Sequence, residues 1–80
     1  MNRAAALTAA DVRDVAGRQM NEATQRLVAT FAGVLPAETV LRIVGEARED
    51  LLNVGLQHPG LATATEAMAR TRLLTLASSR

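Results

Sequence analysis

The side chains that could do chemistry are few, and their spacing does not bring them together. The 80-residue chain has no cysteine and a single histidine, His58. Ser78 and Ser79 lie at the C-terminus, far in sequence from that histidine, so no nucleophile has a base beside it in the pattern. His58 precedes Pro59 and Gly60, a setting typical of a turn or a helix cap. We therefore expect no catalytic residue and no enzymatic activity.

One acidic cluster has the spacing of a cation site. Glu46 and Asp50 lie four residues apart, with Glu49 beside them, and on a helix they could share a cation. Arg42 and Arg48 flank these acids, so ion pairing within one helix is the simpler interpretation. The glycines are isolated and the chain has no lysine, which leaves no phosphate-binding loop of the nucleotide-binding type. We expect neither a metal ion nor a cofactor.

The charge pattern argues against nucleic acid as the main partner. Nine basic residues, all arginine, face eight acidic residues, so the formal net charge is only +1. The two signs are interspersed, whereas nucleic-acid binding usually needs a basic face that neutralises several phosphates. A small DNA-binding regulator resembling a helix-turn-helix protein is the alternative function, with Arg70, Arg72 and Arg80 as its candidate contacts.

No part of the sequence is typical of a membrane or secreted protein. A membrane-spanning helix needs about 18–20 predominantly apolar residues, and no stretch approaches that length. The first ten residues reach no apolar core of secretory length before Asp11. We expect a cytoplasmic protein that does not associate with membranes.

Local signals predict three helices, over residues 9–32, 36–54 and 60–77. Thr8 is a suitable N-cap for the first helix. Pro36 suits the first turn of the second, because its missing N–H would have no partner there. The third helix follows a proline-glycine break. Alanine and leucine dominate the apolar residues, and both favour helix.

Apolar residues recur at helical spacing in all three segments, and no run alternates as a strand would. We therefore predict an all-α fold, a single three-helix bundle over residues 8–77. Residues 1–7 are expected to be flexible and residues 78–80 to fray. The predicted core consists of the inward apolar stripe of each helix: Val12, Met20, Leu27, Phe31, Val40, Val44, Ala47, Leu51 and Met68.

The apolar surface exceeds what one small bundle can bury. The third segment is apolar nearly all round, which is typical of a helix covered on more than one side. A chain of this length has a thin core, and without disulfides oligomerisation is its usual reinforcement. We predict a symmetric homodimer through the second and third helices, in which Leu52→Glu or Leu73→Glu would separate the subunits and Arg18→Ala would not. The candidate interface residues are Leu41, Leu52, Leu56, Leu73 and Leu76.

From about Thr24 to Leu76 the sequence resembles a small actinobacterial family, the three-helix bundle dimerisation domains. Its most telling parts are the spacing from Arg26 to Phe31 and the Ala-Arg-x-Arg-Leu segment at residues 69–73. The other residues that carry the resemblance are Leu27, Gly33, Val34, Val40, Val44, Ala47, Leu51 and Leu61. Residues 53–60 depart from the family pattern.

The resemblance implies a dimerisation module, which agrees with the excess of apolar surface. Such domains occur in front of low-molecular-weight phosphotyrosine phosphatase or arsenate reductase-like domains, and also as separate short proteins. The Cys-x5-Arg catalytic loop of those enzymes is absent here. Any such activity would therefore belong to a fused domain or to another protein chain, either of which is an alternative partner to a second copy.

Overall fold

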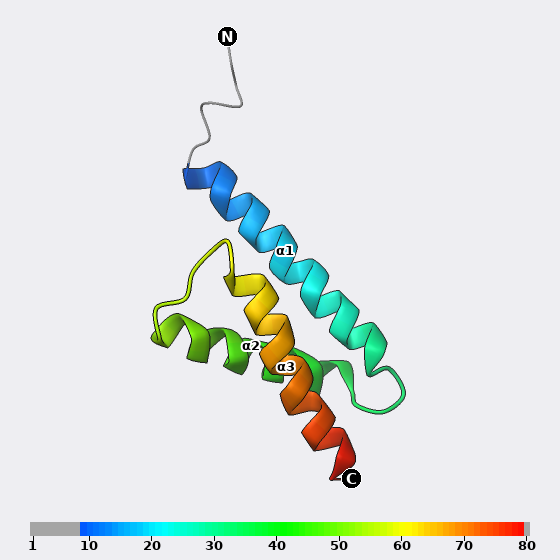
Figure 1. Ribbon diagram of the computed structural model, residues 1–80. Coiled ribbons are helices and arrows are strands. Elements are labelled where there is room, and N and C mark those ends of the chain that lie inside the picture. Colours follow the sequence, from blue (N-terminus) through cyan, green and yellow to red (C-terminus); the bar gives the residue numbers. More distant parts are fainter. Residues whose placement is uncertain (1–8, 80) are drawn as a thin grey trace.

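The computed structural model describes residues 9–79, with side chains from Asp11 onward. It consists of three helices: α1 (Ala9–Thr30), α2 (Ala37–Asn53) and α3 (Leu61–Ser78). Helices α1 and α3 run in the same direction along the molecule, and α2 crosses behind α3 (Figure 1). The predicted all-α three-helix architecture is confirmed. Within the described residues, no helix combines the length and apolar character needed to cross a membrane.

The connection from α1 to α2 is tightened by a glycine in a left-handed conformation. Gly33 has a φ of +82°, which a residue with a Cβ rarely adopts. Just beyond it, the backbone N–H of Leu35 donates a hydrogen bond of 2.9 Å to the carbonyl of Phe31. α1 ends at Thr30, two residues before the predicted end. Pro36 is extended and occupies the N-cap position, so α2 begins one residue later than predicted.

α2 ends in a Schellman motif, in which a left-handed glycine reverses the chain. Gly55 has a φ of +94°, and its N–H donates to the carbonyl of Leu52 at 3.0 Å. The N–H of Leu56 donates to the carbonyl of Leu51 at 3.0 Å, which folds Leu56 back over the end of the helix. This reversal explains why Leu56 is half-buried although it lies outside any helix.

α3 continues one residue beyond its predicted end. Ser78 is its last residue, and the Ser79 N–H donates to the carbonyls of Thr75 and Leu76. The Ser79 hydroxyl donates to the same two carbonyls, at 3.0 and 3.1 Å. Residues 78 and 79 are therefore hydrogen-bonded, where fraying was expected. The prediction for residues 1–7, and that for residue 80, lie outside the described residues.

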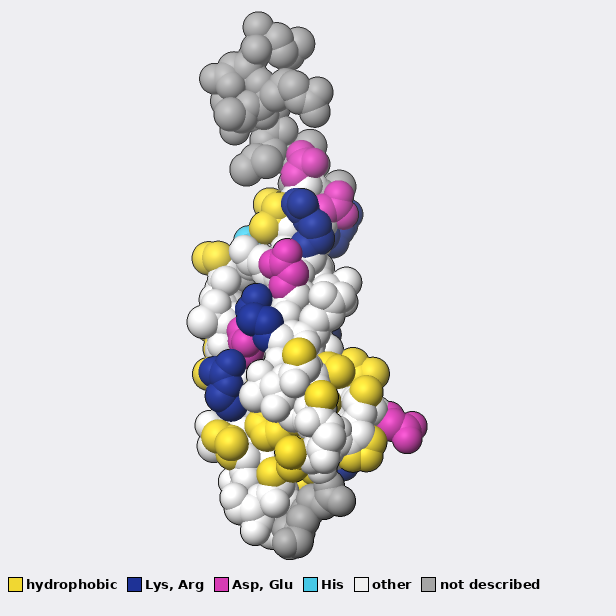
Figure 2. All heavy atoms as spheres, turned by 90° about the vertical axis from the view of Figure 1, so that its right-hand side faces the viewer, with side chains coloured by type: hydrophobic (Ala, Val, Ile, Leu, Met, Phe, Trp, Pro, Cys, Tyr) yellow, Lys and Arg dark blue, Asp and Glu magenta, His cyan; other side chains and the backbone are white. Residues whose placement is uncertain are grey.

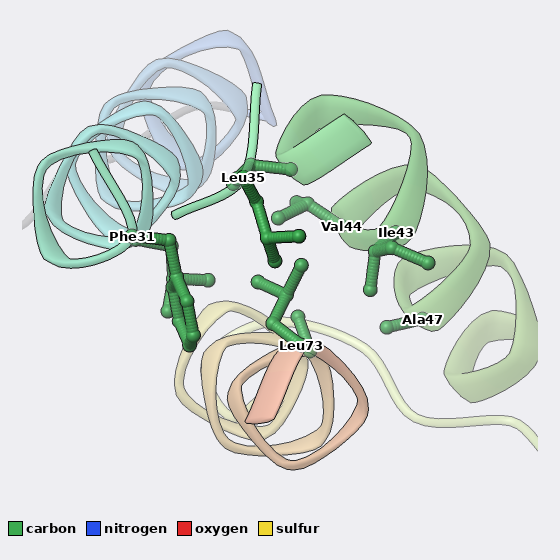
Figure 3. Close-up of a cluster of buried hydrophobic side chains, with 9 residues drawn as sticks. Phe31, Leu35, Ile43, Val44, Ala47 and Leu73 are labelled. Carbon is green, nitrogen blue, oxygen red and sulfur yellow. The ribbon is translucent and has the colours of Figure 1, made fainter. Parts of the chain in front are cut away.

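The core lies where the three helices meet. Phe31 and Leu35 from the connection, Val44 from α2 and Leu73 from α3 point toward one another (Figure 3). Each leucine buried in this way contributes roughly 1.5–3 kcal/mol to folding. The cluster of buried residues is Leu27, Phe31, Leu35, Val40, Ile43, Val44, Ala47, Ala69 and Leu73.

Most of the predicted core residues are covered by the fold, but one is not. Leu27, Phe31, Val40, Val44 and Ala47 are buried, and Met20, Leu51 and Met68 are half-buried. The prediction is wrong for Val12, which keeps 39% of its surface exposed. The first turns of α1 extend past the start of α3, so no neighbouring helix covers them (Figure 1).

The core also contains one buried polar side chain without a partner. Thr65 is 0% exposed, and its hydroxyl forms no hydrogen bond to the described residues. Thr71 and Thr75, on the same helix, instead donate to the carbonyl four residues earlier, at 3.2 and 3.1 Å. An unsatisfied buried hydroxyl costs about 1–3 kcal/mol of stability.

Candidate interaction surface

The seam between α1 and α3 is closed by an ion pair with two hydrogen bonds. Arg26 donates from Nε and Nη2 to the two carboxylate oxygens of Glu66, at 2.9 and 2.7 Å. Arg70, one turn along α3, donates to the same carboxylate at 3.3 Å. Glu66 is the more covered partner, with 14% of its side chain exposed against 59% for Arg26. This cluster fixes the two helices against each other.

These hydrogen bonds shift both partners toward their charged forms. The bonds donated by Arg26 hold the pKa of the Glu66 carboxyl below its ordinary value, although partial burial acts in the opposite direction. The same contact raises the pKa of Arg26. Because the lowered pKa belongs to the folded state, the ion pair stabilises the fold above the ordinary pKa of Glu66 and is lost as the pH falls through the folded value.

We expect Glu66→Gln to lower the free energy of unfolding at neutral pH. The difference from wild type should begin to shrink as the pH falls below about 4.5, the ordinary pKa of this carboxyl, and should vanish below the lowered pKa of the folded state, where the carboxyl is protonated in folded and unfolded protein alike. Urea unfolding curves at neutral and acidic pH measure this difference. Glu46→Gln is the control, since Glu46 is exposed and pairs only with Arg42 at 3.3 Å within α2. An equal loss at both pH values would contradict the assignment.

The seam between α2 and α3 carries a second ion pair. Arg72 of α3 donates to a carboxylate oxygen of Asp50 of α2 at 2.8 Å. Asp50 thus pairs between helices, and only Glu46 and Arg42 show the pairing within α2 that the sequence suggested. Arg70 and Arg72, two of the three candidate DNA contacts, are both held by carboxylates. The third, Arg80, lies outside the described residues.

The seam between α1 and α2 differs from the other two. Among residues 11–79, no ion pair or side-chain hydrogen bond joins these helices. A cavity opens here, with Gly17 and Asn21 of α1 and Arg48 of α2 among its lining residues. A Cβ added at Gly17 would meet nothing within 4 Å, so this flank of α1 is open.

Helical periodicity identifies other residues of α1 and α2 that lie along this open seam. Residues one or two turns apart share a flank. Leu41 lies two turns before Arg48 and Leu52 one turn after it, so both are on the flank of α2 that borders the seam. Val28 lies two turns after Asn21 on α1. We call this set, Val28, Leu41 and Leu52, the apolar seam.

Leu41 is the most exposed member of the apolar seam, at 53%, while Val28 and Leu52 are half-buried. Gly45, one turn after Leu41, has open space where a Cβ would lie. Figure 2 shows hydrophobic side chains gathered in the lower part of the molecule, and most of the charged side chains above them and along one edge. The seam thus has an apolar part and a charged part.

The predicted interface residues do not form one surface. Leu41 is exposed, and Leu52, Leu56 and Leu76 are half-buried, with Leu76 packed against the core. Leu73 is 0% exposed in the monomer, so its prediction as an interface residue is wrong: it points into the core from α3. The sequence interpretation missed three exposed apolar residues. They are Val34 (47%), Val54 (79%) and Leu74 (53%).

The groups considered for catalysis remain apart in the structure. His58 is half-buried beside the start of α3, and Ser79 follows the other end of that helix. An 18-residue helix is about 27 Å long, so no serine–histidine pair forms. Within residues 11–79, no group of three or more histidine, cysteine or acidic side chains is placed to hold a metal ion.

Comparison of the sequence with protein-family models, curated proteins and solved structures found no match. The resemblance to the dimerisation domains therefore stays a prediction based on the residues that carry it. The arginines of that resemblance have structural partners: Arg26 and Arg70 share Glu66, and Arg72 pairs with Asp50.

Proposed function

We propose that this chain is a cytoplasmic, non-catalytic helical module that forms a homodimer through the apolar seam. The observation that carries the proposal is the difference between the three seams. Ion pairs close two of them, whereas among the described residues the third has none and presents Leu41 at 53% exposure. An exposed apolar patch beside an open groove is typical of an interaction site.

A second copy of the chain is the occupant that fits this surface most simply. In a two-fold dimer each patch meets its own copy, so every apolar residue in it counts twice. Half of a leucine side chain contributes roughly 1 kcal/mol on burial. Gly45, which has open space around it, lets a partner helix approach the backbone of α2 closely. These features support a dimer on α1 and α2, in place of the α2 and α3 surface predicted from the sequence.

The other candidate partners have less support. A separate chain or a fused phosphatase-like domain follows from the family resemblance alone. Binding to DNA would draw on Arg70 and Arg72, which already pair with Glu66 and Asp50. Moving Arg72 to a phosphate group would leave Asp50 without its ion-pair partner, and moving Arg70 would remove one of the two arginines on Glu66.

The solution mass tests the proposal. Size-exclusion chromatography with light scattering at micromolar concentration should give twice the 8.5 kDa mass of the chain, with dissociation on dilution. A folded species that keeps the single-chain mass across the micromolar range would refute a homodimer. Circular dichroism on the same fractions establishes that the species measured is helical.

A further inference from the structure

The charged part of the α1–α2 seam contains a cavity of about 640 Å³. It lies beside the N-terminal half of α1, the C-terminal half of α2 and the start of α3. Small-molecule sites are usually about 300–1,000 Å³ in volume. Part of its wall is apolar, formed by residues that include Met20 and Leu61. The cavity is thus large enough for a small organic ligand.

The remaining wall is strongly basic. Arg13 and Arg18 reach the cavity from α1, Arg48 from α2 and His58 from the segment before α3. Asp14 is the one acidic residue among its described lining. Even with His58 neutral, the three arginines outnumber the single carboxylate. A site of this composition favours a ligand with more than one negative charge.

The arginines that line this cavity differ from the other described arginines because they have no carboxylate partner. Within residues 11–79, Arg26, Arg42, Arg70 and Arg72 all pair with a carboxylate. The other arginines in that range form no ion pair, and all of them line the cavity: Arg13, Arg18 and Arg48. The arginines without carboxylate partners therefore all border one cavity, from two helices that are distant in sequence.

The start of α3 adds backbone hydrogen-bond donors that, like the arginines, favour an anion. Leu61 and Ala62 line the cavity in the first turn of α3, where backbone N–H groups have no acceptor within the helix. Gly60 occupies the N-cap position and offers no side-chain cap. The positive end of the helix dipole lies at this turn and favours an anion.

We propose that this cavity binds a small organic phosphate, with the guanidinium groups of Arg13, Arg18 and Arg48 holding the phosphate group. Guanidinium groups match phosphate oxygens in geometry and charge, and they bind them through two parallel hydrogen bonds. The apolar wall at Met20 and Leu61 receives the organic part of the ligand. The residues that line this site differ from those of the apolar seam, and the site adds a ligand to the proposed interaction module.

Titration calorimetry with phenyl phosphate and with inorganic phosphate, at neutral pH and matched ionic strength, tests the proposal. We expect saturable binding, tighter for phenyl phosphate. Arg48→Ala should raise the dissociation constant at least about ten-fold, because a charge-assisted contact is lost. Arg42→Ala, which changes an arginine of the same helix outside this cavity, should leave it unchanged. Arg13→Ala repeats the test from α1 should Arg48→Ala fail to fold.

The two ligands identify the source of the phosphate group. Equal affinities would still support the phosphate site but would make free phosphate its ligand. No saturable binding of either, or the same dissociation constant in wild type, Arg48→Ala and Arg13→Ala, would overturn the proposal. A short DNA duplex that binds more tightly than phenyl phosphate and depends on Arg48 would also overturn it, in favour of a nucleic-acid surface.

Discussion

Leu73→Glu is expected to unfold the monomer. Leu73 is 0% exposed and points into the core from α3, facing Phe31 and Val44 (Figure 3). Loss of a buried leucine side chain alone costs about 2–5 kcal/mol. A carboxylate left without a partner in the core adds several kcal/mol more. A domain of this length has a total stability of roughly 4–12 kcal/mol, so the substitution removes most or all of it.

Far-ultraviolet circular dichroism should show the loss of helix in Leu73→Glu at room temperature. The adjacent substitution Leu74→Glu is the matched control, because Leu74 is 53% exposed and its carboxylate would remain in water. That variant should keep a helical spectrum and melt cooperatively. A helical but monomeric Leu73→Glu protein would contradict this expectation and would return Leu73 to the interface at which the sequence first placed it.

Leu41→Glu is expected to convert the proposed dimer into a folded monomer. In a two-fold interface the change removes two leucines and brings two carboxylates close together. The lost burial and the cost of covering these charges amount to about 3 kcal/mol or more, which raises the dissociation constant at least about 100-fold. Light scattering across a dilution series measures the change, and circular dichroism checks that the fold is intact.

Leu74→Glu is again the control for this substitution. Leu41 and Leu74 are equally exposed, at 53%, but Leu41 borders the α1–α2 seam while Leu74 is on α3. A general effect of exposed apolar surface would act on both positions, whereas the proposed interface distinguishes them. A monomeric Leu74→Glu with a dimeric Leu41→Glu would move the interface away from the apolar seam.

The helices could be predicted to within two residues because their limits depend on local chemistry. Gly33 and Gly55 provide the left-handed turns that end α1 and α2, and Pro36 fixes the extended residue before α2. Leu27, Val40 and Ala47 are buried because they lie on the inward stripe that periodicity defines. These features need no knowledge of how the helices pack.

Features that depend on packing could not be predicted in the same way. α3 is apolar nearly all round, so its sequence does not distinguish the buried Leu73 from the exposed Leu74. Val12 continues the stripe of α1, but it lies beyond the neighbour that would cover it. The partners Arg26 and Glu66 are 40 residues apart, a separation that sequence spacing does not reveal.

The open cavity was also hidden from sequence reasoning. Arg13 has no neighbour in the sequence that marks it as part of a site, Arg18 was expected only to lie outside the dimer interface, and Arg48 flanks the acidic cluster of another helix. Only the packing of the helices brings them to the same wall. Arg26, about two turns after Arg18 on α1, reaches across to Glu66 on α3. The sequence indicates which face of its helix each residue occupies, but it does not indicate which helix packs against that face.

Tertiary contacts hold the C-terminal half of α1 more firmly than its first turns, and ligand binding would change this difference. Its C-terminal half is anchored by Leu27 and by the Arg26–Glu66 pair, whereas its first turns have no covering helix. Local opening needs least free energy where few buried contacts hold a segment. A phosphate held by Arg13 and Arg48 would tie these turns to α2. The ligand would then act as the missing tertiary contact of α1, and its binding energy would appear as protection of this segment from hydrogen exchange.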